Sequence, residues 1–203
     1  MQRYDITTLR CPGPHAGARR LLAPSPASMV GMNPDHGMST PDRFDTADLR
    51  RALGCFGTGV TVVSTLNASG EPVGVTANSF SSVSLDPPIV LWSLRRASPS
   101  LAAFDASSRF VIHVLTLQQV ELSRRFASPV LDKFAGTAHH PGLGGLPLLE
   151  DCAAVFQCLT EQRLEVGDHI LFLGRVQAYD HRPGPTLLYC QGQYAQGMDL
   201  EPR

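Results

Sequence analysis

Small hydrogen-bonding side chains follow one another from Thr76 to Ser84, around a single aromatic residue, Phe80. Backbone N–H and C=O groups in such a stretch can line a planar heterocycle, and the amide of Asn78 supplies both a donor and an acceptor. The same composition is typical of a loop held by local turns between side chains and backbone. The residues alone leave both interpretations open.

Two guanidinium groups, those of Arg95 and Arg96, precede the sequence Ala97-Ser98-Pro99-Ser100. A serine followed by proline is typical of a capped helix start, where the N–H that proline lacks would have had no partner. Free N–H groups and hydroxyls beside two cations form a cradle suited to an anion such as a phosphate. The alternative is an ordinary capped helix with solvated arginines.

A third candidate is His169, which follows Gly167-Asp168. The dipeptide predicts a hairpin turn that delivers the histidine to the start of a strand, at the rim of a sheet. An imidazole there can hydrogen-bond a ligand that lies across the mouth of a barrel, although rim histidines are often only solvated. Asp168 is predicted to shape the turn and to take no part in chemistry.

Other kinds of site are disfavoured. The adjacent residues His139 and His140 project differently and have no third ligand nearby, so a metal site is not expected. Gly57-Thr58-Gly59 lacks the third glycine and the helix of a dinucleotide-binding turn. The five cysteines include no C-x-x-C pair, which fits a reducing cytoplasm.

The elements that must position these residues are mostly strands. Runs rich in β-branched residues predict strands near 60–66, 72–78, 88–95, 109–115, 153–165, 168–180 and 186–191. The turns at 67–70 and 166–168 imply antiparallel neighbours. Long helices do not alternate with the strands, which disfavours a parallel sheet. The prediction is a mainly β protein, an antiparallel split or closed barrel of Greek-key type with a few short peripheral helices.

Three helices and one long loop are predicted around the strands. The first follows Asp45 as its cap, with Phe44 against Leu49 as a hydrophobic staple, and ends before Gly59. The second begins at Ser98, and the third runs from Thr116 through the arginines at 124 and 125. Residues 136–149, rich in glycine and proline, are predicted to form a surface loop.

Composition limits the domain count and the partners. With 43% apolar and 17% charged residues the 203-residue chain can build one core, expected over 44–195. Residues 1–43, rich in proline and glycine, are expected to form a leader, with Met38 as a possible true start, and 196–203 a flexible tail. A net charge of −1 disfavours nucleic acid and anionic membranes, and no apolar run is long enough to span a bilayer.

Four motifs in this order resemble the flavin reductase-like, FMN-binding split-barrel family, which includes reductase components of two-component flavin-dependent monooxygenases. They are Leu53–Val63, Gly74–Pro88, Leu122–Ala127 with Asp132-Lys133-Phe134, and Gly167-Asp168-His169 through Gly174-Arg175-Val176. The resemblance covers about residues 44–194. It implies a split barrel, a homodimer with flavin sites near the interface, and direct hydride transfer from a nicotinamide to a flavin.

The resemblance also implies individual roles. The segments that hold the isoalloxazine and ribityl chain match Thr61, Val62, Thr76, Ala77, Asn78, Ser79, Ser82 and Val83. The phosphate region matches Ser98 and Ser100, and an aromatic residue near the flavin matches Phe126. His169 matches the histidine that contacts the nicotinamide nucleotide. His113 stands where relatives usually have asparagine, which is expected to alter polar contacts near the flavin.

The function that follows is an NAD(P)H:flavin oxidoreductase that reduces FMN or FAD and supplies the reduced flavin to a partner monooxygenase. The choices of FMN or FAD and of NADH or NADPH stay open. One alternative is a reductase that keeps its flavin and reduces ferric or other metal complexes. Others are a non-catalytic barrel that binds flavin or haem, and a barrel that binds an apolar ligand.

Overall fold

The computed structural model of the chain describes residues 45–197. The predicted leader with Met38, the staple residue Phe44 and the end of the predicted tail from residue 198 lie outside the described residues. None of the helices in the described part of the chain has the length and apolarity needed to cross a membrane.

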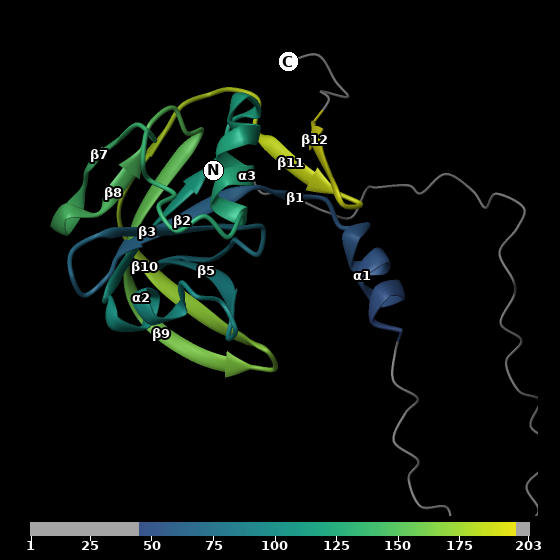
Figure 1. Cartoon of the computed structure of the whole chain (residues 1–203), viewed down its shortest axis with the longest axis horizontal. Coiled ribbons are helices and arrows are strands. Elements are labelled where there is room, and N and C mark those ends of the chain that lie inside the picture. Colours follow the sequence, from purple (N-terminus) through teal and green to yellow (C-terminus); the bar gives the residue numbers. More distant parts are fainter. Residues whose placement is uncertain (1–44, 198–203) are drawn as a thin grey trace, which may run out of the picture. The chain divides into compact units, whose positions relative to one another are not determined.

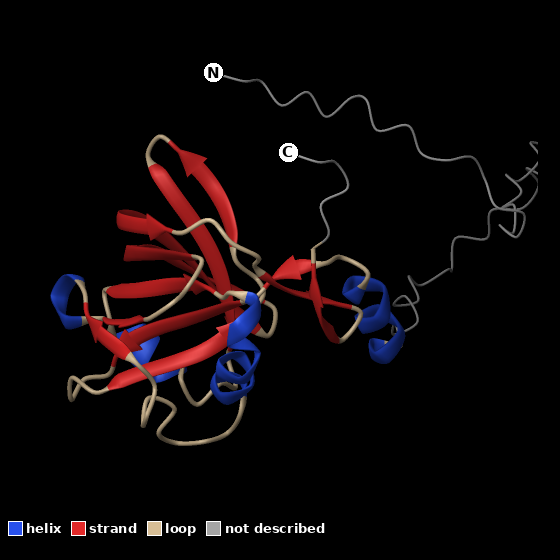
Figure 2. Ribbon diagram, turned by 90° about the horizontal axis from the view of Figure 1, so that it is seen from above, coloured by secondary structure: helices blue, strands red, loops and turns tan. Residues whose placement is uncertain are grey.

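Strands are the predominant secondary structure of the described chain, in agreement with the predicted mainly β class (Figures 1 and 2). The strands are β1 (Thr58–Gly59), β2 (Thr61–Leu66), β3 (Pro72–Ala77), β4 (Ser81–Leu85), β5 (Pro88–Arg95), β6 (Arg109–Val114), β7 (His139–Pro141), β8 (Pro147–Leu149), β9 (Ala154–Val166), β10 (His169–His181), β11 (Leu187–Cys190) and β12 (Gln193–Gln196). The helices are α1 (Thr46–Gly54), α2 (Leu101–Ala106) and α3 (Val120–Ala127), with short 3₁₀ turns at Leu117–Gln119 and Leu143–Gly145.

Seven strands form one antiparallel sheet in the order β3-β2-β6-β9-β10-β5-β4. The edge strands β3 and β4 are not hydrogen-bonded to each other, so the sheet coils without closing, as expected of a split barrel. Strands β5 and β6 follow each other in the chain but lie apart in the sheet, which is the Greek-key feature. Smaller sheets are formed by β1-β11-β12 and by β7-β8.

The barrel core follows the period-two pattern of the strands. On β5 the side chains of Val90, Trp92 and Leu94 are buried at alternate positions, because every second side chain of a strand points to the same face. Trp92 stacks on Phe172 of β10 with ring centroids 4.8 Å apart. The aromatic rings of the core thus connect β5 to β10.

A second apolar cluster lies under α3. It includes Val62 of β2, Phe126 of α3 and Phe134 from the following loop, with the rings of Phe126 and Phe134 edge to face at 5.0 Å. Gly74 of β3 permits this packing, because a Cβ there would lie 2.5 Å from the Phe126 ring. The cluster fixes α3 against β3.

Several element boundaries differ from the prediction. Strand β4 was hidden in the serine-rich segment, and β7 and β8 form a small hairpin within the predicted loop of residues 136–149. Helix α2 begins at Leu101, later than the predicted start at Ser98. The predicted cap of α1 is confirmed, since the Asp45 carboxylate accepts hydrogen bonds from the backbone N–H groups of Ala47 and Asp48.

Helix α1 lies beside the β11–β12 hairpin and outside the seven-stranded sheet in both views (Figures 1 and 2). The backbone N–H of Gln191 donates to the carbonyl of Gly54 at 2.8 Å, which ties the end of the helix to the hairpin. No residue of α1 is buried. Its apolar side chains Leu49 and Leu53, and Phe56 just beyond it, are exposed by 44%, 67% and 79%.

Candidate functional site

A hollow of about 440 Å³ lies where β3, β5 and β10 meet. Its lining includes seven of the residues that the sequence singled out, and they come from three separate segments of the chain: Thr76, Ala77, Asn78, Ser79, Arg95, Ser98 and His169. The other lining residues are Val75, Ser93, Leu94, Ala97 and Pro99. The structure therefore brings the three candidate stretches into one site.

The pairing of β5 with β10 creates this convergence. Arg95 and His169 face each other as register partners at the ends of the two strands. The backbone N–H of Arg96 donates to the carbonyl of Asp168 at 2.9 Å, which holds the β9–β10 turn against the end of β5. The cation and the imidazole thus stand together at the rim of the hollow.

The carboxylate of Asp168 is hydrogen-bonded to His169 and faces Arg95, which the sequence did not predict. One oxygen lies 2.7 Å from Nδ1 of His169, and the other lies 4.0 Å from Nε of Arg95. The hydrogen bond from His169 lowers the pKa of the Asp168 carboxyl, and the charge of Arg95 adds to the effect. With Nδ1 engaged, Nε2 is the ring nitrogen left to meet a ligand.

Two hydroxyls in the site hold its walls in place. The Thr76 hydroxyl donates to the carbonyl of Ser123 at 2.7 Å, linking β3 to α3. The Ser79 hydroxyl accepts from the backbone N–H of Ser93 at 2.9 Å and lies 3.2 Å from its carbonyl. Within residues 45–197 no hydrogen-bond partner is found for the Asn78 amide, so its donor and acceptor are both available.

The predicted anion cradle is altered. The Ser98 hydroxyl accepts from the backbone N–H of Ser100 at 3.3 Å and lines the hollow, but Ser100 lines a neighbouring hollow instead. The guanidinium of Arg96 lies 3.8 Å from the Glu165 carboxylate, and Arg96 is not among the lining residues. Arg95 and Ser98 are therefore the members of the cradle that reach the site.

Three of the residues predicted to contact the cofactor do not line the hollow, and their contact with a flavin stays a prediction. The side chains of Thr61, Val62 and Phe126 are buried in the structure and present no surface to a ligand. The Thr61 hydroxyl donates to the carbonyl of Ala77 at 2.7 Å, while Val62 and Phe126 pack in the cluster under α3. Thr61 therefore supports the wall of the hollow at Ala77, and Val62 and Phe126 form part of the apolar core.

Two further predicted residues lie outside the hollow. Ser82 and Val83 are exposed on the edge strand β4, where the register with β5 shifts between Ser82 and Ser84. Such a bulge leaves Val83 without a paired partner and turns its side chain. Their contact with a flavin stays a prediction.

His113 has a role that differs from the expected one. Its ring is completely buried, with Nδ1 3.0 Å from the carbonyl of Val62 and Nε2 accepting from the backbone N–H of Leu149 at 3.1 Å. Burial lowers the pKa of His113 to about 4, so the ring is neutral at physiological pH. His113 does not line the hollow and instead joins β2 and β6 to β8.

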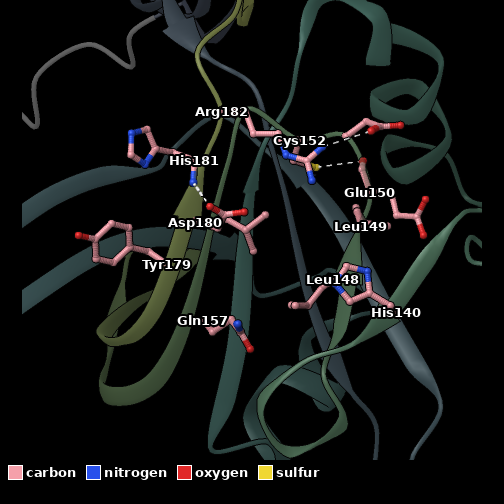
Figure 3. A pocket seen from close by; sticks show the side chains of 12 residues that line it. His140, Leu148, Leu149, Glu150, Cys152, Gln157, Tyr179, Asp180, His181 and Arg182 are labelled. Atoms are coloured by element: carbon pink, nitrogen blue, oxygen red, sulfur yellow. Dashed lines mark hydrogen bonds and ion pairs between the residues drawn. The ribbon is translucent and has the colours of Figure 1, made fainter.

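A second hollow, of about 280 Å³, lies at the other end of β10 (Figure 3). Arg182 lies 3.6 Å from the Asp151 carboxylate in this hollow, and the Cys152 thiol lies 3.6 Å from the backbone carbonyl of Glu150. Burial raises the pKa of Cys152 to about 11, which keeps the thiol protonated and unreactive. None of the sequence-predicted site residues lines this hollow.

Comparison with known proteins agrees with the geometry. The family model described as flavin reductase like domain matches residues 53–198. The chain belongs to the flavin reductase-like family. The family resemblance seen in the sequence is thereby confirmed, because the match spans the motifs around β2, β3, α3 and β10.

Two relatives are similar in sequence to this chain over most of its length. It is 43% identical over 155 residues to a probable flavin reductase from Rhizobium meliloti, covering 76% of this chain and 50% of the relative. It is 40% identical over 147 residues to the reductase component of a flavin-dependent trigonelline monooxygenase from Acinetobacter baylyi, covering 72% and 47%. The chain thus spans about half the length of these curated relatives.

A solved structure has the same fold. The NADH:FAD oxidoreductase SgcE6 of Streptomyces globisporus, in complex with NAD and FAD fragments, superposes with a TM-score of 0.73 at 35% identity. The match covers 77% of this chain and 96% of that protein.

Proposed function

We propose that this protein is an NAD(P)H:flavin oxidoreductase that reduces FMN or FAD and supplies the reduced flavin to a partner monooxygenase. The observation that carries the proposal is the single hollow that unites the Thr76–Ser79 segment, the Arg95–Ser98 region and His169. Family membership supports it, as does the relative named as the reductase component of a monooxygenase.

The donor set of the hollow fits a flavin. Within residues 45–197 the Asn78 amide has no hydrogen-bond partner, so it can meet the polar edge of a planar ring, and Ala77 and Ser79 line the same wall. Arg95 and Ser98 stand where a phosphate would be held by a charge-assisted hydrogen bond. When bound, the flavin supplies the hydride-accepting chemistry, and the chain supplies binding and orientation.

His169 positions the nicotinamide in this proposal. The Asp168 carboxylate fixes its ring at the rim, with Nε2 free to donate or accept a hydrogen bond. Hydride transfer requires the reacting atoms to lie roughly 3–3.5 Å apart with water excluded. The apolar side chains Val75 and Leu94, which line the same hollow, would exclude water there.

The proposed assembly is a homodimer that uses α1. The exposed side chains Leu49, Leu53 and Phe56 give this helix an apolar face that nothing covers within the described residues. The hollow of about 740 Å³ between α1 and the β11–β12 hairpin is lined in part by Asn78, which also lines the candidate flavin site. A second copy seated there would lie next to the flavin.

The alternatives assign the same hollow other tasks. A reductase of ferric complexes would retain its flavin through turnover, and a non-catalytic barrel would bind flavin without oxidising a nicotinamide. The Asp168–His169 pair favours catalysis, because an oriented rim imidazole has no task in a barrel that only stores flavin. We place the protein in the cytoplasm, where both nucleotides are available, and the functional unit at residues 44–195.

Steady-state oxidation of NADH and NADPH by the purified full-length chain, with FMN, with FAD and without added flavin, tests this function. We expect turnover that saturates with added flavin. A rate of nicotinamide oxidation that does not change with added flavin, and that continues with a ferric chelate as electron acceptor, would favour the flavin-retaining reductase. Flavin binding without oxidation of either nucleotide would refute the catalytic proposal.

A further inference from the structure

Two free cysteines lie where helix α1 ends against the β11–β12 hairpin (Figure 1). Cys55 directly follows α1 and is exposed, while Cys190 is the last residue of β11 and is half-buried. The turn after Cys190 consists of Gln191 and Gly192, both with positive φ, as in the tight turns that join paired strands. The position of Cys190 is therefore fixed by the hairpin.

Both cysteines adjoin one peptide group, the one between Gly54 and Cys55. The Cys190 thiol donates to the carbonyl of Gly54 at 3.8 Å. The backbone N–H of Gln191, the residue after Cys190, donates to the same oxygen at 2.8 Å. In a trans peptide this oxygen lies on the same side as the Cα of the next residue, which is Cys55. Two cysteines that are distant in sequence thus become neighbours in space.

The separation suits a disulfide. A disulfide joins residues whose Cα atoms lie about 4.4–6.8 Å apart, and residues that flank one interstrand peptide hydrogen bond lie roughly 5.5 Å apart. A Cβ added to Gly57 would lie 3.7 Å from Sγ of Cys190, so this sulfur faces the chain on both sides of Cys55. The Cys55 thiol now donates to the carbonyl of Arg51 at 3.6 Å, a weak bond that a side-chain rotation would break.

The junction at Gly54 has little else to support it. No residue of α1 is buried, so the packing of its side chains contributes little to its position. A hydrogen bond from a backbone N–H and one from a thiol connect the helix end to the hairpin. A covalent bond at this place would replace the weak thiol contact with a permanent one.

We propose that Cys55 and Cys190 form a disulfide when the protein meets hydrogen peroxide, and that this bond joins the end of α1 to β11. The exposed Cys55 sulfur attacks one peroxide oxygen, the O–O bond breaks, and a sulfenic acid and one water result. The Cys190 sulfur then attacks the Cys55 sulfur and displaces a second water. Two thiols and one peroxide therefore give one disulfide and two waters.

The oxidant has a source in the proposed function. Reduced flavin that meets dioxygen before it meets a monooxygenase is oxidised, and the dioxygen becomes hydrogen peroxide. A thiol pair on the reductase itself would be exposed to this peroxide first. Disulfides of this kind in a reducing compartment are transient and respond to oxidants. The thiol pair itself does not depend on the proposed function, which supplies only the peroxide.

Treatment of the reduced full-length protein with hydrogen peroxide, followed by alkylation, digestion and mass spectrometry, tests the inference. We expect a peptide that links Cys55 to Cys190, an intact mass lower by two hydrogen atoms, and reversal by dithiothreitol. Cys190→Ser should instead stop at a sulfenic acid on Cys55, which dimedone traps. Cys11→Ser, the matched control, should form the same disulfide as the unchanged protein. A covalent dimer through Cys55, or Cys55 oxidised without a link to Cys190, would overturn the proposal.

Thermal unfolding tests whether the bond reinforces the fold. The oxidised protein should have a Tm about 5 °C or more above that of the reduced protein, because the disulfide closes a loop that includes most of the described chain. Peroxide should not raise the Tm of Cys55→Ser, and an equal Tm for oxidised and reduced protein would refute the reinforcement. NADH oxidation with FMN by the reduced protein tests the proposed function separately. Loss of that activity would count against the function and leave the thiol pair standing.

Discussion

At the scale of single residues, the site depends on a few polar contacts that orient other groups. Asp168 holds His169 on one oxygen and faces Arg95 with the other, and Ser79 fixes the wall through the backbone of Ser93. The sequence identified His169 and Ser79, because their residue types and turn context are local signals. It did not identify the role of Asp168, since the strand pairing that brings Arg95 near is not visible in the sequence.

Replacing His169 tests its positioning role. His169→Ala should raise the apparent KM for the nicotinamide about five- to tenfold, because a hydrogen bond to the bound nucleotide is lost. The Kd of flavin should change little. Steady-state kinetics and flavin titration measure the two effects separately, with the exposed His181→Ala as a control. An unchanged KM would remove this role.

Asp168→Asn tests whether the carboxylate acts through the histidine. The variant keeps the size of the side chain but weakens its hydrogen bond to His169, so KM should rise by less than in His169→Ala. In the double variant the Asp168 substitution should add nothing further. Additive effects on KM in this double-mutant cycle would show that Asp168 contacts the nucleotide independently.

The buried His113 predicts a pH dependence of stability. Its pKa is lowered from 6.5 to about 4, so between these values the unfolded chain binds the proton more readily. The contribution of His113 to the free energy of unfolding is fully present above pH 6.5 and falls by roughly 3 kcal/mol as the pH is lowered to 4. Denaturant unfolding at several pH values should show a smaller loss in His113→Asn. The same pH slope in both proteins would contradict this account.

At the scale of elements, the longer strands could be predicted well and the short ones could not. Residues 61–66, 88–95 and 109–114 carry β-branched and aromatic runs that any strand pattern detects. Strand β4 is rich in serine and is shaped by its bulge against β5, and β12 is fixed by pairing with β11. Such elements depend on their neighbours more than on their own residues.

Gly174 shows how closely two strands approach in the core. A Cβ at this position would lie 2.3 Å from the Phe110 ring and 3.0 Å from Cβ of Cys158. Gly174→Ala should therefore destabilise the fold by about 1–3 kcal/mol through overpacking. Gly184→Ala, where nothing lies within 4 Å of the added carbon, is the control. Thermal unfolding of both variants measures the effect, and equal unfolding midpoints for Gly174→Ala and Gly184→Ala would refute the predicted clash.

At the scale of the whole molecule, the apolar face of α1, which nothing covers within residues 45–197, is the feature that the described part of the chain does not explain. The sequence predicted the helix and its Asp45 cap correctly, and the family resemblance implied a dimer. Which face of the helix would be left uncovered could not be predicted, because helical periodicity does not show what an apolar face contacts.

The proposed dimer makes this face testable. Leu53→Asp together with Phe56→Asp should shift the protein from dimer to monomer in light scattering after gel filtration, because two buried apolar side chains would become charged. Leu85→Asp, on the edge strand, should leave the mass unchanged. A wild-type protein that is already monomeric at micromolar concentration would contradict the proposal.

The central claim is that one hollow holds a flavin and admits a nicotinamide to it. Anaerobic mixing of the full-length protein and flavin with NADH, followed by loss of the flavin's visible absorbance, tests this most directly. The account predicts rapid bleaching that depends on protein concentration and slows in His169→Ala at limiting NADH. Bound flavin that stays oxidised in excess NADH and NADPH would contradict it and leave a barrel that only binds flavin.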